Sequence, residues 1–251
     1  MPVRSLLYYL GSRDKFKPKI LPLLKQLSAG CQEYREPFAG GLSVGLAMMS
    51  RRPDLRMWVN DRDPSVACFW YCVRNFPDAL IARIRPVEPS IATFRVAKAL
   101  LNRTIRIPEN SEDIADVALA RLIVQNMSFS SLGSGPRGGN QQFYGRIGER
   151  WKPEAISREV AFHSARLRRL NVRITGYDFE RLILDDSCRA ILYLDPPFLM
   201  VSNQYPYRMS FEDHKRLADL LAATSHPFVM SQSDHPKTRE LYAWAQVQEI
   251  G

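Results

Sequence analysis

The sequence predicts an α/β fold, in which helices alternate along the chain with the strands of one sheet. Strand-like and helix-like segments follow one another near both ends of the 251 residues, and such alternation is typical of α/β sheets. One short strand runs into a glycine turn at residues 36–42, and one apolar run ends at two prolines at 196–197. Both features mark places where a chain leaves the edge of a sheet.

The N-terminal part contains two predicted strands, each followed by a turn. Residues 16–28 carry apolar positions at helical spacing, and residues 34–38 form a short strand that enters the glycine turn. Residues 43–50 are predicted to be the next helix. A second strand is expected over residues 56–60, ending at Asp61.

The C-terminal part contains three more predicted strands, at residues 172–177, 190–194 and 227–231. A helix is expected over residues 210–223, between the last two strands. Ser210 can serve as its N-cap, and Asp213 stands at the capping-box distance, with Asp in place of the usual Glu.

Residues 77–160 break this alternation and are predicted to form an inserted module. The segment is helical at residues 91–101 and 113–124, then polar and glycine-rich over residues 126–151. Loops of this length are usually functional or disordered. Arginines in and after the loop give the module a basic surface: Arg146, Arg150, Arg158, Arg166, Arg168, Arg169 and Arg173. We therefore expect residues 1–76 and 161–251 to form one domain and residues 77–160 another.

The composition favours a folded protein with a polyanionic partner. Hydrophobic residues make up 45% of the chain, which is enough for a sizeable core. Lys and Arg number 35 against 26 Asp and Glu, a net charge of +9. Basic side chains displace counterions from a phosphate backbone, although a soluble basic protein without such a partner has the same charge.

The cysteines and histidines predict neither a metal site nor disulfides. No CxxC pair is present, and no His stands at ligand spacing from Cys68 and Cys72. We expect the thiols to be reduced and buried, which suits a cytoplasmic protein. No apolar run approaches the ~20 residues that span a membrane, and the N-terminus has too short an apolar run for a signal peptide.

Two neighbouring strand ends indicate a nucleotide-like ligand. In residues 36–43 (EPFAGGLS) a strand ends in a glycine turn that opens a helix, which brings backbone close to a ligand at the sheet edge. A generic tight turn has the same pattern. Asp61, at the end of the next strand, can accept hydrogen bonds from a ribose hydroxyl pair. The sequence contains no P-loop, so binding of a nucleoside triphosphate has little support.

The stronger motif is Asp195-Pro196-Pro197-Phe198, directly after the apolar residues 190–194. Two prolines cannot donate hydrogen bonds or continue a central strand, so they fix the backbone where the chain leaves the sheet. The Asp195 carboxylate and the Pro196 carbonyl can then accept the two N–H bonds of a ring amino group, on which Phe198 can stack. A proline-stiffened strand exit with a capping aspartate is the alternative.

Together these motifs resemble the Dam-type family of DNA adenine N6-methyltransferases. The resemblance covers residues 8 to about 245 and rests on an ordered set, of which DPPF is the most specific member: residues 9–15 (YLGSRDK), 36–41 (EPFAGG), 59–61 (VND), 177–179 (YDF), 194–198 (LDPPF) and 228–231 (FVMS). It implies a Rossmann-like methyltransferase sheet with helices on both faces, S-adenosylmethionine as cofactor and double-stranded DNA as partner. The target adenine is expected to flip out of the duplex.

The resemblance also assigns roles to matching residues. The cofactor contacts it implies are Tyr9 and Arg13 in the N-terminal motif, Phe38 and Gly40 beside the methionine moiety, Asp61 at the ribose, and Asp178 and Phe179 near the adenine. The catalytic motif around the target amine is matched by Asp195, Pro196, Pro197 and Phe198, and Asp195 is counted with the cofactor contacts as well.

Residues 77–160 correspond, by the same resemblance, to a mainly helical DNA-recognition module. Asn126, Arg137 and Arg146 are the expected DNA contacts. Arginine can read guanine edges or hold the phosphate backbone. The arginines at 166–169 fit either a phosphate grip or a solvated helix face.

Three features depart from the family pattern. Leu42 stands where a second glycine is usual and can crowd the turn, although Gly41 can serve instead. Phe198 replaces the common Tyr, which keeps the stacking face and loses a hydroxyl. The chain ends at Gly251, where family members usually continue to a further antiparallel strand.

Other functions fit part of the pattern. Cytosine N4, RNA adenine or a protein amide could replace the acceptor, but the similar amide methylases carry Asn and the cytosine enzymes more often Ser at the position of Asp195. A DNA-binding homologue that has lost catalysis is favoured by Leu42 and the early end, and disfavoured by the intact DPPF motif. The recognition sequence, the oligomeric state and a role in restriction–modification do not follow from the sequence.

Overall fold

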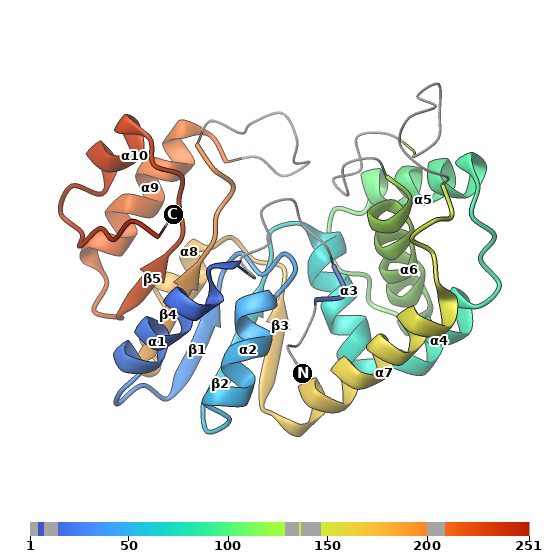
Figure 1. Cartoon of the computed structure of the whole chain (residues 1–251), viewed down its shortest axis with the longest axis horizontal. Helices are drawn as coiled ribbons and strands as arrows, with labels where there is room; N and C mark the ends of the chain where they lie inside the picture. The colour runs from blue at the N-terminus through green and yellow to red at the C-terminus, as the bar shows by residue number, and fades with distance from the viewer. Residues whose placement is uncertain (1–4, 8–14, 129–135, 137–146, 200–208, 251) are drawn as a thin grey trace.

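The computed structural model describes residues 5–7, 15–128, 136, 147–199 and 209–250, and it confirms the α/β fold (Figure 1). One parallel sheet has the strand order β3-β2-β1-β4-β5. Its strands are β1 (Glu33–Glu36), β2 (Arg56–Asn60), β3 (Val172–Thr175), β4 (Ala190–Leu194) and β5 (Phe228–Met230). The bounds of β2 and β4 agree with the sequence prediction. β1 begins one residue and ends two residues earlier than predicted, β3 ends two residues earlier, and β5 is one residue shorter at each end.

The central strands are buried on both faces, as expected for a parallel sheet. All five residues of β4 are buried, as are four of the five in β2. β1 pairs with β2 on one side and with β4 on the other, with Glu33 opposite both Arg56 and Ala190. The strand order therefore reverses between β1 and β4, and ligands of such sheets bind beyond the carboxyl ends at this switch point.

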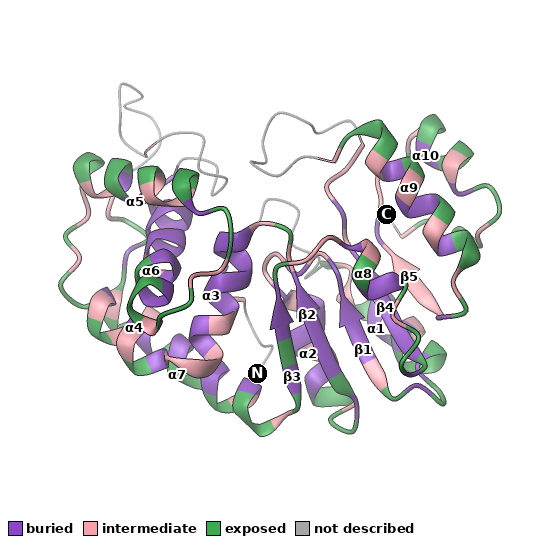
Figure 2. Cartoon of the chain, turned by 180° about the vertical axis from the view of Figure 1, so that it is seen from behind, coloured by how far each residue is buried: buried purple, intermediate pink, exposed green. Residues whose placement is uncertain are grey.

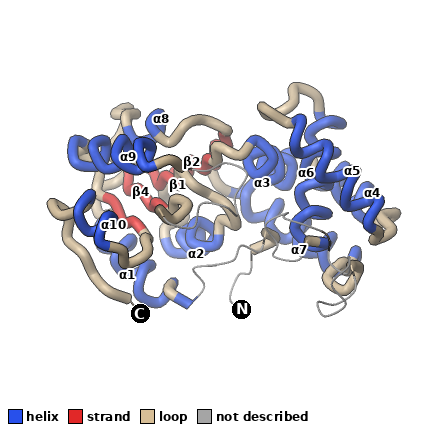
Figure 3. Tube along the Cα trace, turned by 90° about the horizontal axis from the view of Figure 1, so that it is seen from above, coloured by secondary structure: helices blue, strands red, loops and turns tan. Residues whose placement is uncertain are grey.

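Helices cover both faces of the sheet, which confirms the predicted layers. In Figure 3, α1 (Lys17–Leu27) and α2 (Ser43–Arg51) lie on one side of the strands, and α8 (Glu180–Ile183) and α9 (Phe211–Ala223) lie on the other. The predicted capping box of α9 is present, because Ser210 and Asp213 each accept from the other's backbone N–H at 3.0 Å. The last helix is α10 (Pro236–Leu241).

The remaining helices form a group beside β3, visible at one side of Figure 1. They are α3 (Pro64–Asn75), α4 (Pro77–Ile84), α5 (Ile91–Arg103), α6 (Ser111–Met127) and α7 (Pro153–Arg169). In this group α6 is buried along most of its length (Figure 2). α4 begins at residue 77, where the inserted module was predicted to start, but α7 runs without a break past residue 160. The division into two domains stays a prediction.

Two arginines of α7 bind neighbouring helices. Arg166 donates to the Leu46 carbonyl at 2.9 Å and to Ser50 Oγ at 2.6 Å, both in α2. Arg168 donates to the carbonyls of Arg74 and Asn75, at the end of α3. The Arg166 bonds join the helical group to α2, and the Arg168 bonds join α7 to α3 within that group.

The apolar core has two parts. The larger cluster extends from α1, α2 and the sheet through α3 and α6, and the smaller one lies between β4 and α9 around Phe179, Leu192 and Leu217. All four cysteines are free and buried, as predicted. Within the described residues, no cluster of His, Cys, Asp and Glu could hold a metal ion, and no helix is long and apolar enough to cross a membrane.

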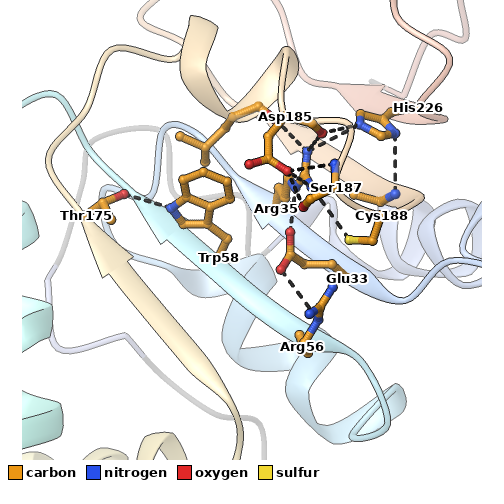
Figure 4. Close-up of polar contacts among 11 residues, drawn as sticks. Glu33, Arg35, Arg56, Trp58, Thr175, Asp185, Ser187, Cys188 and His226 are labelled. Carbon is orange, nitrogen blue, oxygen red and sulfur yellow. Dashed lines mark hydrogen bonds and ion pairs between the residues drawn. The ribbon is translucent and has the colours of Figure 1, made fainter.

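A fully buried arginine anchors β1 on the α8 side of the sheet (Figure 4). Arg35, 0% exposed, donates to Glu33 Oε1 at 2.6 Å, to the Leu182 carbonyl at 2.8 Å, and to both the carbonyl and Oδ1 of Asp185 at 2.5 and 3.0 Å. It also lies over the ring of Trp58, 5.4 Å from the centroid. Successive side chains of a strand point to opposite faces, so this cluster is on the face away from Glu36.

Candidate active site

The carboxyl ends of β1, β2 and β4 bring three acidic side chains together at the switch point. Asp61 Oδ2 accepts from the backbone N–H of Gly40 at 2.8 Å, which joins the end of β2 to the turn after β1. The negative charges of Asp195 and Asp61 both act on Glu36. Three carboxyl groups from separate parts of the sequence therefore share one edge of the sheet.

The glycine turn is held to β2 by its backbone. Besides the Gly40–Asp61 bond, the Ala39 N–H donates to the Asn60 carbonyl at 2.8 Å, and Trp70 Nε1 donates to the Gly40 carbonyl at 2.9 Å. Gly40 has φ +44°, a left-handed conformation that glycine adopts at little cost. The backbone of the predicted cofactor turn is thus fixed from both sides.

Leu42 does not crowd the turn. It is the one non-glycine residue with positive φ, +55°, among the described residues, and it serves as the N-cap of α2. A left-handed leucine costs about 1–2 kcal/mol, while burying a leucine side chain contributes about 1.5–3 kcal/mol. Its side chain is buried in the core, so the burial offsets the backbone strain.

Gly41 is the position in this turn that cannot carry a side chain. A Cβ there would lie 2.6 Å from the Leu7 carbonyl oxygen and 3.1 Å from Ser5 Oγ. Ser5 Oγ donates to the carbonyls of both Gly41 and Leu7, and Leu7 is buried in the core. The N-terminal residues 5–7 therefore pack directly on the turn.

We expect Gly41→Ala to destabilise the protein by about 1–3 kcal/mol, because the methyl group must displace the Leu7 backbone. Chemical denaturation measures this change. Gly176→Ala is the matched control, since a Cβ at Gly176 meets its neighbours at 3.6 Å or more, in ordinary van der Waals contact. Equal stability of the two variants would show that residues 5–7 do not pack on the turn as described.

Asn60 joins three strand ends through its side-chain amide. Its Nδ2 donates to the carbonyls of Pro37 and Tyr177, both at 3.0 Å, and its Oδ1 accepts from the Tyr177 N–H and from Thr175 Oγ1, both at 2.7 Å. Asn60 was not expected from the sequence to have a role of its own. The sequence does show an amide at the end of an apolar strand, directly before Asp61. A polar side chain buried there needs hydrogen-bond partners.

Glu36 caps α2 from the neighbouring strand. Its Oε2 accepts from Tyr34 Oη at 2.5 Å, and its carboxyl group interacts with the backbone N–H of Gly45 in the first turn of α2. A Cβ at Gly45 would lie 2.5 Å from this oxygen, so glycine makes the contact possible. Burial raises the pKa of Glu36 to about 8, and the charges of Asp195 and Asp61 add to the increase. Desolvation, and then the Asp63 charge, raise the pKa of Asp61 to about 7.

These two pKa values predict a pH dependence of stability. A carboxyl group whose pKa is higher in the folded than in the unfolded state binds more protons when folded, so the free energy of unfolding falls as pH rises between the two values. For Glu36 this window runs from 4.5 to about 8, and for Asp61 from 3.8 to about 7. Each group contributes a slope of up to about 1.4 kcal/mol per pH unit.

We expect Glu36→Gln to remove one of these two slopes, because the amide oxygen keeps both hydrogen bonds without titrating. Urea denaturation from pH 5 to pH 8 measures the free energy of unfolding of the variant and of the unaltered chain. The exposed Glu154→Gln, in the first turn of α7, is the control and should leave the slope unchanged. A Glu36→Gln variant with the same pH slope as the unaltered chain would contradict the prediction.

The end of β3 places Asp178 and Phe179 beside α9. Asp178 is bound through both carboxylate oxygens by Arg216 of α9, at 3.1 and 3.0 Å. The Phe179 ring is 1% exposed and lies 5.5 Å from the ring of Phe38, centroid to centroid. The structure therefore brings Phe38, Asp178 and Phe179 together, but the Phe179 ring belongs to the core.

The DPPF motif leaves β4 at the same edge. Asp195, Pro197 and Phe198 are partly exposed and Pro196 is buried. The Leu194 carbonyl accepts from the Ser231 N–H at 2.8 Å, and the buried imidazole of His214 interacts with the Pro197 backbone. Burial lowers the pKa of His214. The motif is thus fixed by β5 and by α9, and neither Asp195 nor Phe198 is turned into the core.

The expected DNA contacts are placed only in part. Asn126 is 5% exposed in the last turn of α6, where its Nδ2 donates to the Leu122 carbonyl at 2.9 Å. This bond lies within its own helix, and a DNA contact by Asn126 stays a prediction. Arg137 and Arg146, like the cofactor residues Tyr9 and Arg13, lie outside the described residues. Their roles stay predictions.

The acidic edge fits S-adenosylmethionine, which carries positive charge on its sulfonium and ammonium groups. The raised pKa values of Glu36 and Asp61 show that their burial leaves negative charge poorly compensated there, even though Arg121 of α6 lies near Asp61 and 3.6 Å from Asp63. A cationic ligand would supply that compensation. Asp61 stands at the strand end where related nucleotide sites hold a ribose, and its role as the ribose acceptor stays a prediction.

Comparison with protein families agrees with this geometry. No curated protein matches the chain. A family model described as D12 class N6 adenine-specific DNA methyltransferase matches residues 9–251 and so includes every motif discussed above. Members of this family transfer a methyl group from S-adenosylmethionine to the N6 amino group of adenine in DNA. With almost its whole length matched, the chain belongs to the D12 class N6 adenine-specific DNA methyltransferases.

Proposed function

We propose that this chain methylates adenine N6 within double-stranded DNA and that the acidic edge of its sheet holds both reactants. The observation that carries the proposal is the convergence of Glu36, Asp61 and the DPPF motif at the switch point between β1 and β4. This is the place where sheets of this topology bind nucleotides.

On this proposal the cofactor lies along the ends of β1, β2 and β3. Phe38 and Gly40 lie beside the methionine moiety, Asp61 accepts from the ribose, and Asp178 with the backbone of Phe179 receives the adenine. Tyr9 and Arg13 complete the site. S-adenosylmethionine supplies an electrophilic methyl group whose leaving group is a neutral thioether.

Asp195 and Pro196 act on the target amine. The adenine amino group is a poor nucleophile because its lone pair is delocalised into the ring. The Asp195 carboxylate and the Pro196 carbonyl accept its two N–H bonds and favour a pyramidal nitrogen. Pro197 stiffens this backbone, and Phe198 stacks on the base, a contact worth about 1–3 kcal/mol. Orienting two reactants in this way can lower a barrier by about 7–11 kcal/mol.

DNA binding is assigned to the helical group and its loop. Within a duplex the amine is inaccessible, so the adenine flips out at a cost of a few kcal/mol. Residues 77–160, with Arg137 and Arg146 in the loop, are proposed to hold the duplex, and Asn126 joins them only if the end of α6 rearranges. The four buried thiols suit a reducing cytoplasm as the place of action.

Mass spectrometry of nucleosides tests the proposal. Unmethylated duplex DNA incubated with the protein and S-adenosylmethionine should yield N6-methyladenine, and single-molecule sequencing of the same DNA should locate the target sequence. N4-methylcytosine, or methylation of RNA alone, would give the chain another acceptor. DNA binding without any methylated nucleoside would identify the catalytically inactive homologue.

A further inference from the structure

We propose that Arg216 is a positioning residue for the cofactor adenine, acting by holding Asp178 at the end of β3. The inference rests on the proposed function, because it takes Asp178 as the acceptor for the adenine amino group. Arg216 itself lies on α9 and was not among the residues expected from the sequence to act at the site.

Arg216 is surrounded by acceptors from two elements. It binds Asp178 through two parallel hydrogen bonds, Nη1 to Oδ1 at 3.1 Å and Nη2 to Oδ2 at 3.0 Å. Nη1 also donates to Glu180 Oε2 at 2.7 Å, and Nη2 donates to Asp213 Oδ1 at 3.2 Å. The bidentate pair fixes the plane of the Asp178 carboxylate as well as its position.

The same guanidinium group covers the neighbouring ring. Arg216 Cζ lies 4.4 Å from the centroid of Phe179, whose ring is in contact with Phe38 at 5.5 Å. Phe179 is thereby held between Phe38 of the cofactor turn and Arg216 of α9. These ring contacts also hold the Phe179 backbone, which the proposed function places beside the adenine.

Among the described contacts, Arg216 is the only arginine that links α9 to Asp178. Three carboxylates, those of Asp178, Glu180 and Asp213, converge on this one cation. Arg62 pairs with one of the three, Asp213, at 3.9 Å. Like charges left together repel one another, and without Arg216 the Asp178 side chain would keep the Glu180 N–H, at 3.1 Å, as its described hydrogen-bond donor.

The first turns of α9 also contact the catalytic motif. Asp213 closes the capping box of α9, and the next residue, His214, interacts with the Pro197 backbone. Arg216, two residues further, binds Asp178. One helix start thus holds the proposed adenine acceptor of the cofactor and the backbone that receives the target base.

An ordinary surface ion pair would have little effect, since such pairs contribute about 0–1 kcal/mol. Arg216 differs because its main partner is a proposed ligand group. We therefore expect its loss to change ligand selectivity as well as stability. The decisive comparison uses two probes: S-adenosylhomocysteine, and its analogue whose purine carries hydrogen in place of the 6-amino group.

Calorimetry with Arg216→Ala should show S-adenosylhomocysteine binding weakened by about tenfold or more, the scale of a lost charge-assisted hydrogen bond. Binding of the analogue, which has no amino group to donate to Asp178, should change by less than about threefold. The unaltered chain should prefer S-adenosylhomocysteine over the analogue, and the variant should lose that preference. In steady-state assays KM for S-adenosylmethionine should rise while kcat at saturation changes little.

Two further variants separate positioning from folding. Arg216→Lys keeps the charge without the fork and should restore part of the preference. Arg239→Ala removes a comparable arginine, which binds Asp234 at 2.5 and 2.8 Å and Glu249 at 2.6 Å rather than the carboxylates that bind Arg216, and should leave both affinities unchanged.

The outcomes distinguish this inference from the proposed function. If the unaltered chain binds the cofactor product and methylates DNA, but Arg216→Ala weakens both probes equally or neither, the positioning role is wrong and the proposed function stands. A chain that binds neither probe and methylates no adenine overturns both.

Discussion

Replacing Asp195 by alanine is expected to lower kcat for DNA methylation by at least about 10³-fold and to leave cofactor affinity nearly unchanged. Removing one positioned hydrogen-bonding group of a transition state costs about 10²–10³ in rate. Asp195 is expected to do more, because it also orients the amine, and orienting two reactants can lower a barrier by about 7–11 kcal/mol.

The structure supports separating catalysis from binding at this position. Asp195 lies where β4 ends, and its backbone neighbourhood is fixed by the Ser231–Leu194 bond and by His214 on Pro197. Truncating the side chain should therefore leave the loop in place. Most of the proposed cofactor contacts come from other strand ends, those of β1, β2 and β3.

Single-turnover methylation and calorimetry with S-adenosylhomocysteine measure the two effects independently. Asp195→Asn keeps one oxygen acceptor and should fall between alanine and the unaltered chain in rate. Asp219→Ala, an exposed position on α9, is the control and should turn over normally. Turnover by Asp195→Ala close to that of the unaltered chain would remove the carboxylate from the mechanism.

Sequence patterns were sufficient for the strands and for part of the helices. β2 and β4 are buried at nearly every position and end at chemically distinct residues, Asp61 and the DPPF motif. α3, in which nine of twelve residues are buried, was missed. The similarly buried α6 was nevertheless expected, over residues 113–124, so burial alone does not decide which helix the sequence reveals.

The site residues also differ in whether the sequence reveals them. Residues proposed to meet a ligand directly, such as Asp61 and Asp195, stand in recognisable motifs. Residues that support them from other elements, such as Arg216 and Asn60, are recognisable only once the fold brings them together. Asp213 and Arg216 do have the i,i+3 spacing of a helical ion pair, but that spacing alone cannot reveal Asp178 as the third partner.

The buried arginine of β1 gives the largest expected effect on stability. We expect Arg35→Met to lower the free energy of unfolding by about 3–5 kcal/mol, the range for removing one partner of a buried ion pair. The substitution leaves the Glu33 and Asp185 carboxylates without their shared cation and removes a donor from the Leu182 and Asp185 carbonyls (Figure 4). Proteins are stable by only about 5–15 kcal/mol, so the variant loses a large share.

The neighbouring Arg56 supplies the matched control for this experiment. It approaches the same Glu33 carboxylate, but at 3.8 Å and with 49% of its side chain exposed. Solvent screens such a pair, so Arg56→Met should cost less than about 1 kcal/mol. Arg35→Lys keeps the buried charge while losing the fork, and it should retain enough stability for a denaturation curve if the methionine variant does not fold.

Comparing Arg35 with Arg56 separates the contribution of the buried Arg35 contacts from that of the pair with Glu33. Both cations approach the same Glu33 carboxylate, but only Arg35 is buried and bound to Leu182 and Asp185. If burial decides the outcome, denaturation midpoints should rank the unaltered chain and Arg56→Met together, Arg35→Lys below them and Arg35→Met lowest. A similar loss for Arg35→Met and Arg56→Met would mean that Glu33 is the common cause and that the contacts to Leu182 and Asp185 contribute little. The join between β1 and the segment from α8 to β4 would then depend on strand pairing and apolar packing alone.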